Sequence, residues 1–600
     1  MTPEFPALRA NALRDTWCGQ VLEDRVDDQA RVAGWVHRRR DHGGLVFIDL
    51  RDRTGLVQLV FNPDRAGDAF ELGHSLRSED VISVAGTVIR RSEATINAEM
   101  PTGAFEVIVA QAQLLADADT PPFEIESFSG EVGEELRLKY RYLDLRREPM
   151  QRAIAMRAAV MRAMRGFFET EGFLEIETPM LSRSTPEGAR DFLVPARREA
   201  GSFYALPQSP QLFKQLLMVA GFERYFQIVR CFRDEDQRAD RQPDFTQLDV
   251  ELSFVEIEDV LDLNERMIAH VFAEVGGPAI ELPIERLRYD DAVDRFGTDH
   301  PDLRFGMELA DLSDDLRETE FKVFRGVLDS GGAVKGINVG AREMPRSALD
   351  ALIARAQELG AKGLVWAFRE GDDWRSPTAK FLTESELAAL NERLGADEGD
   401  LLLVVADTKR TASAVLGQLR LDMGRRFEMI DESANAFCWI VDWPLFEWNE
   451  GEERWDPLHH PFTAPDGELD SAQPGAARAQ AYDIVWNGQE LGGGSIRISD
   501  PELQISALKA IGIGAEEAQE RFGFLLDALR FGAPPHGGIA YGFDRFVQRL
   551  VGADSIRDVI AFPKAASGAD PLTGAPAPVD DAQLRDLGLQ LRPGALKRSG

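Results

Sequence analysis

The stretch that decides the fold is RYFQIVRCFRDEDQRADRQPDFTQLDVELSF, residues 224–254. It predicts a hairpin of two strands joined by a long loop, because apolar and polar side chains alternate on both sides of a charged segment. The apolar face of the second strand comprises Thr246, Leu248, Val250, Leu252 and Phe254. If that face packs on helices, Gln247, Asp249 and Glu251 form the floor of a cavity, and Arg233 joins them if the strands pair in that register. The alternative is a solvated sheet face.

The loop of this hairpin, residues 234–244, carries Glu235, Arg238, Arg241 and Gln242. A loop with both signs of charge suits the recognition of a triphosphate and of an adenine edge. It is the first candidate binding segment.

A second candidate segment is QELGGGSIRI, residues 489–498. Its glycines allow the backbone to approach a ligand closely, and Glu490 and Arg497 add opposite charges. Asp483 precedes it in AYDIVW, so Asp483 and Glu490 form a candidate pair for Mg²⁺, which proteins usually hold with one or two carboxylates plus substrate phosphates. The alternative is an ordinary glycine-rich turn.

A third segment is HGGIAYGFDRFVQRLVG, residues 536–552. Asp544 opens a predicted helix whose first turn holds Arg545, and helix N-termini and arginine both favour phosphate. The alternative is a capped amphipathic helix. Weaker signals are TPEGARDF at 185–192, LPQSPQLFKQ at 206–215, and the doublet His459-His460, which lacks a third metal ligand.

The N-terminal region predicts five short strands and therefore a small barrel. The strands are expected at 30–38, 44–51, 56–61, 80–89 and 105–114. In the second strand Val46, Ile48 and Leu50 alternate with Phe47, which would stand between polar groups on the outer face. That arrangement suits the stacking of a flipped base, although a lone phenylalanine on a strand is often a core residue.

The length of 600 residues predicts roughly three to five domains. An apolar helical pattern at 152–171 (Ile154, Ala158, Met161, Met164, Phe168) precedes a strand at 173–178 that ends at Pro179. The expected domains are a barrel at 1–115, a hinge at 116–145, a first catalytic part at 146–310, an inserted domain at 311–425, a second catalytic part at 426–563 and a tail at 564–600.

Composition limits the binding partners, the cysteine chemistry and the cellular location to be expected. The formal charge of −34 means that most of the surface repels a polyanion such as nucleic acid. Nucleic-acid binding therefore requires local basic patches such as Arg38-Arg39-Arg40. Cys18, Cys231 and Cys438 are too few and too widely spaced for a disulfide framework or a zinc pair. With no apolar run that could span a bilayer and no secretory signal, a cytoplasmic location is expected.

Taken in order, these segments resemble the class II aminoacyl-tRNA synthetases and, within them, the bacterial aspartyl enzymes, along nearly the whole chain. The helix, strand and Pro179 look like the first motif of that family, which forms a homodimer interface. The FRDED hairpin looks like the second motif, and GFDR at 542–545 looks like the third. The insertion is similar to a domain shared with bacterial amidotransferases. The resemblance implies an α/β multidomain fold: a five-stranded OB-type β-barrel, a class II antiparallel sheet flanked by helices, and an inserted α+β domain.

The resemblance also implies roles for single residues. Arg233 would contact the α-phosphate and the aspartate carboxylate, Glu235 would read adenine, and Arg545 would hold the γ-phosphate; with Glu490, the two arginines are the expected catalytic residues. The other ATP-site positions are Asp234, Gln242, Gly542, Phe543 and Asp544. The aspartate-binding positions are Glu187, Gln211, Lys214, Arg233, Asp249, His459 and Arg497. Mg²⁺ would bind Asp483 and Glu490, and the anticodon would meet Arg38, Arg40, Phe47 and Gln58.

The implied activity is that of an aspartate–tRNA ligase, which uses ATP and Mg²⁺ to form aspartyl-adenylate and transfers aspartate to the 3′ end of tRNA(Asp). Whether tRNA(Asn) is also charged stays open. His42 resembles the relaxed enzymes of the family, whereas the region of Thr95 lacks their glycine. We lean towards relaxed specificity, which would link the enzyme to a tRNA amidotransferase. The alternatives are an asparaginyl or lysyl enzyme, or a non-catalytic paralogue that binds RNA.

Overall fold

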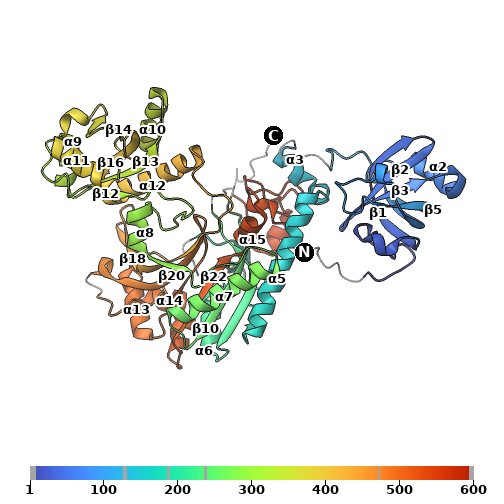
Figure 1. Ribbon diagram of the computed structural model, residues 1–600. Helices are drawn as coiled ribbons and strands as arrows, with labels where there is room; N and C mark the ends of the chain where they lie inside the picture. The colour runs from blue at the N-terminus through green and yellow to red at the C-terminus, as the bar shows by residue number, and fades with distance from the viewer. Residues whose placement is uncertain (1–7, 126–131, 186–188, 236–239, 471–472, 593–600) are drawn as a thin grey trace. The chain divides into compact units, whose positions relative to one another are not determined.

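The computed structural model describes residues 8–125, 132–185, 189–235, 240–470 and 473–592 (Figure 1). The chain divides into two compact units, Met1–Arg152 with Asp570–Thr573, and Ala153–Ala569 with Gly574–Gly600. Within the described ranges, no helix has the length and apolar character needed to cross a bilayer.

The first unit contains a closed five-stranded barrel in the order β1-β2-β3-β5-β4, as predicted. Its strands are β1 (Gln29–His42), β2 (Leu45–Asp52), β3 (Gly55–Phe61), β4 (Val81–Arg90) and β5 (Phe105–Ala116). Val46, Ile48 and Leu50 are fully buried in the barrel core and Phe47 is only half-buried, so the two predicted faces of β2 are confirmed. The sequence did not predict α1 (Pro63–Ala66) and α2 (Asp68–Ser75), which lie between β3 and β4. Two further helices of this unit are α3 (Glu134–Lys139) and α4 (Arg141–Asp144).

The second unit is organised around an eight-stranded sheet in the order β11-β17-β20-β21-β22-β10-β9-β6. Its strands are β6 (Leu174–Glu175), β9 (Arg224–Phe232), β10 (Asp244–Ser253), β11 (Glu285–Arg288), β17 (Phe437–Pro444), β20 (Arg478–Trp486), β21 (Gln489–Ile496) and β22 (His536–Gly542). Neighbouring strands are antiparallel except at the two ends, where β11 pairs with β17 and β6 with β9 in parallel. The antiparallel hairpin β9–β10 predicted from the sequence is therefore part of a larger sheet, in which β9 lies next to the edge strand β6.

Helices cover both faces of this sheet. One face carries α5 (Glu148–Thr170), α7 (Ile257–Glu274) and α15 (Phe543–Val551), which share one hydrophobic core with Leu248, Val250 and Ile539 of the sheet. The other face carries α6 (Gln211–Val219), which packs through Leu212 with α13 (Pro501–Ala510) and α14 (Ala515–Leu529). The polar face of β10 is thus enclosed by α6 rather than exposed to solvent, which confirms the buried floor expected from the alternation.

Two details of the apolar pattern were predicted wrongly. Ala158 of α5 is exposed, because the buried stripe of this helix runs through Val160, Met164 and Phe168. Phe254 does not continue the apolar face of β10: it has a φ of 60°, and 68% of its surface is exposed. The left-handed backbone at Phe254 ends the alternation of the strand, and its N–H donates to the carbonyl of Pro535.

Between β11 and β17 the chain forms a separate five-stranded sheet in the order β12-β13-β16-β14-β15. Its elements are β12 (Ala310–Asp311), α9 (Lys322–Asp329), β13 (Ala333–Ala341), α10 (Arg346–Glu358), β14 (Val365–Glu370), β15 (Asp373–Arg375), α11 (Glu384–Arg393), β16 (Asp400–Asp407) and α12 (Lys409–Arg426). Buried Arg420 of α12 donates to the carbonyls of Asp302, Phe305 and Gly306, and burial lowers its pKa to about 10. This arginine ties the segment that enters the insertion to the helix that leaves it.

The remaining α-helices and strands belong to the second unit and are short. They are the hairpins β7 (Leu193–Pro195) with β8 (Phe203–Ala205) and β18 (Phe446–Asn449) with β19 (Arg454–Pro457), together with α8 (Tyr289–Phe296) and α16 (Asp581–Asp586).

Candidate active site

Two acidic side chains lie in one row across five adjacent strands of the large sheet. The strand register aligns Gln227, Asp249, Ala540, Gly493 and Asp483 on five adjacent strands. Residues directly opposite each other in antiparallel strands point to the same face, so all five share the face that α6 covers. The sheet therefore brings together two acids that are 234 residues apart in the chain.

Glycine makes room for these acids. A Cβ atom on Gly538 would lie 2.1 Å from Oε2 of Glu251, and one on Gly493 would lie 2.4 Å from Oδ1 of Asp483. Real Cβ atoms do not approach an oxygen so closely, because van der Waals repulsion forbids it. The two glycines are thus required by their cross-strand neighbours and not by a turn.

Two cations neutralise Asp249 of this row and Glu251, which lies two residues further along β10. Lys214 of α6 places Nζ 3.0 Å from Asp249 and 3.4 Å from Glu251. Arg497 donates to both carboxylate oxygens of Glu251, at 2.9 and 3.0 Å, in a bidentate pair. All four side chains are buried. Such a buried network recognises a further charged group only through atoms that its internal pairs leave unused.

The two acids of this network differ in their proton affinity. Burial alone would raise the pKa of Glu251, but the charges of Arg497 and Lys214 and the hydrogen bonds from Arg497 outweigh it and lower the pKa to about 2. Burial raises the pKa of Asp249, and Lys214 opposes the rise only in part. Oδ2 of Asp249 is buried and has no hydrogen-bond partner among the described residues. This oxygen can therefore accept a hydrogen bond from a ligand.

The histidine doublet lies beside this network. Nε2 of His459 donates to Asp483 at 3.0 Å, and its buried Nδ1 has no partner in the described part of the chain. Nε2 of His460 accepts from Arg497 at 2.6 Å, and burial followed by the charge of Arg497 lowers the pKa of His460 well below its ordinary value. Among the described residues no cluster of three or more histidine, cysteine or acidic side chains is suited to a metal.

The residues expected to bind ATP begin where β9 ends. Arg233 lies on the Asp249 face, with its guanidinium 5.1 Å from the ring centre of Phe245. Asp234 forms a β-bridge with Arg190, and its N–H donates to the carbonyl of Arg190 at 3.0 Å. Glu235 pairs with Arg241 at 2.7 Å. The structure therefore joins the hairpin loop to the segment that follows residue 188; Glu187 and Arg238 lie outside the described residues.

Gln242 closes the far side of the hairpin loop. Its side-chain amide exchanges two hydrogen bonds with the backbone of Lys564, accepting at 2.7 Å and donating at 3.2 Å. This pairing anchors the loop to the segment that follows the third motif.

Arg545 lies next to Glu490. Its Nη1 donates to the carbonyl oxygen of Glu490 at 2.6 Å, and its buried Nε is unpaired among the described residues. Glu490 keeps an exposed surface, but the protein around its carboxyl group still raises the pKa by partial desolvation, and the charge of Asp483 raises it further, while Arg545 opposes the shift. Asp483 and Glu490 therefore repel each other, which is the electrostatic condition that a bound cation relieves.

Two residues expected at the ATP site face the opposite side of the sheet. Phe543 is fully buried in the core beneath α5 and α7. Asp544 pairs with Arg157 and accepts from the N–H of Thr246 at 2.8 Å. The structure does not bring either side chain to the Asp249 face. Gly542 precedes them as the residue before α15, so that this turn places Arg545 on the site side.

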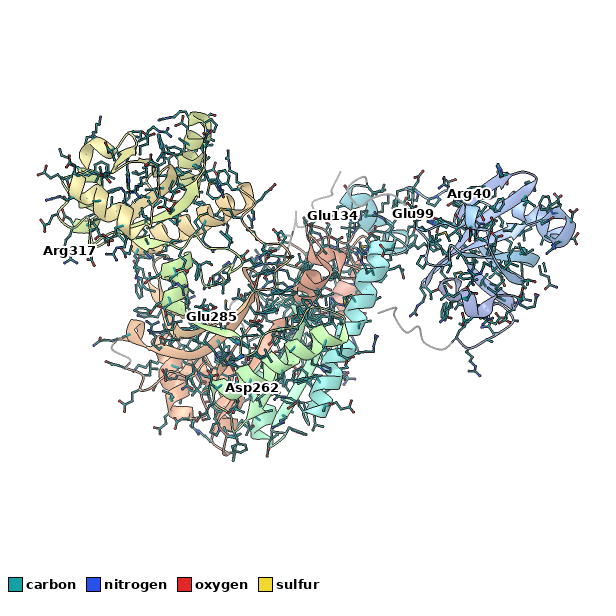
Figure 2. All side chains as sticks on the ribbon, viewed as in Figure 1. Arg40, Glu99, Glu134, Asp262, Glu285 and Arg317 are labelled. Carbon is teal, nitrogen blue, oxygen red and sulfur yellow. The ribbon has the colours of Figure 1, made fainter. Side chains whose placement is uncertain are left out.

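The outer face of the barrel carries a second polar network. Arg40 donates to Asp49 at 2.9 Å and to Gln58 at 3.3 Å, and Gln58 donates to Glu106 at 2.7 Å. Figure 2 shows Arg40 on the barrel. Phe47 is directly opposite Arg40 in the β1–β2 pair and lies on the same face. Arg38 is exposed two residues before Arg40. The network reaches Glu106 only because β3 pairs with β5.

The two residues expected to govern tRNA choice lie at the rim of the barrel. His42 ends β1 and is exposed. Thr95 closes a short 3₁₀ turn and donates to the carbonyl of Ser92 at 3.0 Å.

Sequence reasoning missed several members of both sites. Gln215 and His536 belong to the Asp249 region, and Glu106 and Arg91 to the barrel face. Glu251 and His460 were visible in the sequence, but nothing marked them as the partners of Arg497. Only a correct strand register would have identified these contacts.

Comparison with known proteins places the geometry in context. The family described as "tRNA synthetases class II (D, K and N)" matches residues 133–566, and the family described as "OB-fold nucleic acid binding domain" matches residues 30–115. An "Aspartate--tRNA(Asp/Asn) ligase" of Caldanaerobacter subterraneus subsp. tengcongensis is 54% identical over 582 residues, which cover 96% of this chain and 98% of that relative. An "Aspartate--tRNA ligase" of Bacillus licheniformis is 52% identical over 584 residues, covering 96% of this chain and 99% of the relative.

Among solved structures, the asparaginyl-tRNA synthetase of Pyrococcus horikoshii complexed with asparaginyl-adenylate superposes with a TM-score of 0.58 at 19% identity. The match covers 91% of this chain and 97% of that one. At this identity the likeness concerns the fold alone.

Proposed function

Since the chain belongs to the class II tRNA synthetases, and within them to the bacterial aspartate–tRNA ligases, we propose that the acidic row and the arginines around it are where aspartate and ATP react. The enzyme activates aspartate as an adenylate and transfers it to tRNA. The observation that carries the assignment of the site is the buried network of Lys214, Asp249, Glu251 and Arg497, in which both cations and one unpaired acidic oxygen face the same side of the sheet.

We assign the substrate groups by charge. The side-chain carboxylate of aspartate pairs with Lys214 and Arg497, and His459 stands beside it. The α-ammonium group is a donor and suits the unpaired Oδ2 of Asp249. Asparagine would present a neutral amide to the two cations in place of a carboxylate, which is a weaker acceptor and carries an NH₂ group that cannot pair with them, so this arrangement discriminates against it.

The reaction needs no protein nucleophile, because the α-carboxylate of aspartate is itself an anion that attacks the α-phosphate. Arg233 lies at the end of β9 on the same face as Asp249 and stabilises the charge that develops there. Arg545, held by the carbonyl of Glu490, receives the leaving pyrophosphate. Asp234, Glu235 and Gln242 line the loop that holds the nucleotide. Positioning and charge supply the catalysis.

The carboxylates of Asp483 and Glu490 fit a magnesium ion. They are hard oxygen ligands, they raise each other's energy by repulsion, and Gly493 leaves space above the strand for Asp483. The ion would supply charge neutralisation at the phosphates. The chain's own part is to hold the two carboxylates on adjacent strands β20 and β21.

Amino-acid-dependent exchange of pyrophosphate into ATP tests this assignment. Exchange with aspartate, and none with asparagine or lysine, is expected from the purified protein. Exchange that follows lysine or asparagine instead would contradict the pairing of Lys214 and Arg497 with a carboxylate.

We further propose that the enzyme charges tRNA(Asn) as well as tRNA(Asp). The support is His42 at the end of β1, at the rim of the barrel, and a relative named for both tRNAs. On this proposal the product Asp-tRNA(Asn) passes to a tRNA amidotransferase. The enzyme, its tRNA substrates and the amidotransferase are all located in the cytoplasm. Parallel aspartylation of the two tRNA transcripts tests it, and charging of tRNA(Asp) alone would refute it.

We propose that the anticodon binds the outer face of the barrel. Phe47 offers a half-exposed ring for stacking, and Arg38 and Arg40 offer charge. Gln58 is buried between Arg40 and Glu106, and it offers a base only the second amide hydrogen and the remaining oxygen lone pair that these contacts leave unused.

A homodimer is the proposed assembly. The supporting observation is that β6 ends the large sheet at an edge, where apolar Leu174 is half-exposed. Leu181, in the segment after β6, and Phe222, just before the neighbouring strand β9, are half-exposed as well. Exposed apolar residues at a sheet edge favour association with a second copy. Sedimentation equilibrium is expected to report twice the mass of the chain, and a monomer at micromolar concentration would refute the proposal.

A further inference from the structure

The inner face of α6 is unusually polar. Gln211, Lys214 and Gln215 are all buried, and they lie on one face because residues three and four apart on a helix are neighbours. Lys214 pairs with Asp249 and Glu251. A buried amide also needs hydrogen-bond partners, so the contacts of the two glutamines require an account of their own.

The two glutamines belong to a chain of hydrogen bonds that ends at the backbone of the segment before β22. Nε2 of Gln211 donates to Oε1 of Gln215 at 3.2 Å. Nε2 of Gln215 lies 3.4 Å from Nε2 of His536, and Nδ1 of His536 lies 2.8 Å from the carbonyl oxygen of Pro534. His536 and Gln215 are fully buried.

Which atom donates in each of these hydrogen bonds follows from the last acceptor, the carbonyl oxygen of Pro534. The carbonyl of Pro534 can only accept, so Nδ1 of His536 carries a hydrogen. Burial lowers the pKa of His536, so the ring is neutral at physiological pH and its Nε2 is an acceptor. Gln215 must then present its NH₂ group to His536 and its oxygen to Gln211.

This direction determines what Gln211 offers a ligand. Its NH₂ group is turned towards Gln215, and Oε1 of Gln211 accepts no hydrogen bond from the described residues. An acceptor oxygen can pair only with a donor. The single donor group of zwitterionic aspartate is its α-ammonium, since both of its carboxylates accept.

We propose that His536 is a positioning residue that acts through Gln215 to hold the carbonyl oxygen of Gln211 as an acceptor for the α-ammonium group of aspartate, beside Oδ2 of Asp249. The inference rests on the proposed assignment of Gln211 to the aspartate site. It assigns a role to buried His536 and Gln215, which are not expected to contact aspartate or ATP.

The proposal predicts a pH dependence with a defined sign. A proton on Nε2 of His536 would face the NH₂ group of Gln215, so the amide of Gln215 would turn over, and the amide of Gln211 with it. Gln211 would then present NH₂ to the ammonium group. The charged groups that face His536 are Glu251, which favours its protonation, and Arg497, which opposes it. The relay is therefore intact at neutral pH, and aspartate binding weakens as pH falls through the lowered pKa of His536.

Three variants of the full-length enzyme test the relay by pyrophosphate exchange. His536→Ala removes the acceptor and is expected to raise the KM for aspartate about fivefold to tenfold, with the KM for ATP unchanged, because one oriented hydrogen bond to a charged group is lost. His536→Gln places an amide oxygen near the position of Nε2. It is expected to keep the KM within about twofold at pH 7.5 and to abolish the rise at low pH. Gln211→Ala reports on the underlying assignment. Asn391→Ala, a buried amide of the inserted domain, is the control for lost stability alone.

The outcomes distinguish a wrong assignment of Gln211 to the aspartate site from a wrong role for His536. If Gln211→Ala leaves the KM for aspartate unchanged, the assignment of Gln211 is wrong. If Gln211→Ala raises it but His536→Ala does not, the relay is refuted. Should His536→Ala fail to fold, the pH profile decides, because identical profiles for the unmodified enzyme and His536→Gln would overturn the proposal.

Discussion

Removing Arg497 is the most decisive perturbation of the proposed site. Its guanidinium uses Nε and Nη2 on Glu251, while Nη1 contacts Ser495 at 2.7 Å and His460 at 2.6 Å. Nη1 donates both of its hydrogens to these two neutral neighbours, whereas Nη2 donates only one of its two hydrogens to Glu251. The second N–H of Nη2 is therefore the donor of Arg497 that is available to a substrate carboxylate. In Arg497→Ala the carboxylate of aspartate would meet Lys214 alone.

The size of the effect follows from burial. Breaking a buried and hydrogen-bonded charge pair costs about 3–5 kcal/mol, because the remaining charge has no partner in a region of low polarity. If that cost falls on the substrate carboxylate in the transition state, kcat/KM for aspartate drops by about two to four powers of ten. ATP binding should change by less than about threefold, since Arg497 contacts no residue assigned to the nucleotide.

The assay is aspartate-dependent pyrophosphate exchange, with ATP binding measured separately at equilibrium. The substitution also leaves buried Glu251 with Lys214 as its one remaining cation partner among the described residues. The double variant Arg497→Ala with Glu251→Gln is therefore needed: it should recover thermal stability and remain inactive. Arg286→Ala, which loses partly buried pairs with Glu258 and Glu265 outside the site, should lower stability while leaving the KM for aspartate unchanged. Exchange by Arg497→Ala within tenfold of the unmodified enzyme would refute the reasoning.

Four further predictions concern other parts of the molecule. Gly493→Ala should raise the Mg²⁺ concentration for half-maximal exchange about tenfold or more, because its Cβ would displace the carboxylate of Asp483; an unchanged Mg²⁺ titration contradicts this. Because the pKa of Glu490 is raised, protons should compete with Mg²⁺ at a higher pH than at an ordinary carboxyl group, so that the Mg²⁺ requirement rises as pH falls. Glu490→Gln should flatten that pH dependence. Asp544→Asn should lower the free energy of unfolding by about 3 kcal/mol, measured by urea titration, since it leaves the half-buried Arg157 without its anionic partner. A loss below about 1 kcal/mol would argue against a structural role. Phe47→Ala should reduce tRNA charging about tenfold, through the loss of one stacked base, and leave pyrophosphate exchange intact; equal losses in both assays would exclude a role confined to the anticodon.

Much of the fold was readable from local pattern. The alternation in β2 and β10 identified their buried faces, because a strand that faces a core on one side must alternate. The motifs around Arg233, Arg497 and Arg545 carried the family and hence the activity. Local pattern failed at Phe254, whose left-handed backbone ends the strand. It also failed at Ala158, because α5 turns the face with Val160, Met164 and Phe168 towards the core and leaves Ala158 exposed.

By itself, the sequence determined the barrel, the β9–β10 hairpin and the family, since each depends on short-range alternation or on the order of motifs along the chain. Only the tertiary structure decided which charges meet. The pairing of Arg497 with Glu251, the alignment of Asp249 with Asp483, and the link from His536 through Gln215 to Gln211 join residues from different strands and helices. Their contacts depend on strand register and helix placement, which arise from packing the whole sheet at once, and no local stretch of sequence encodes them.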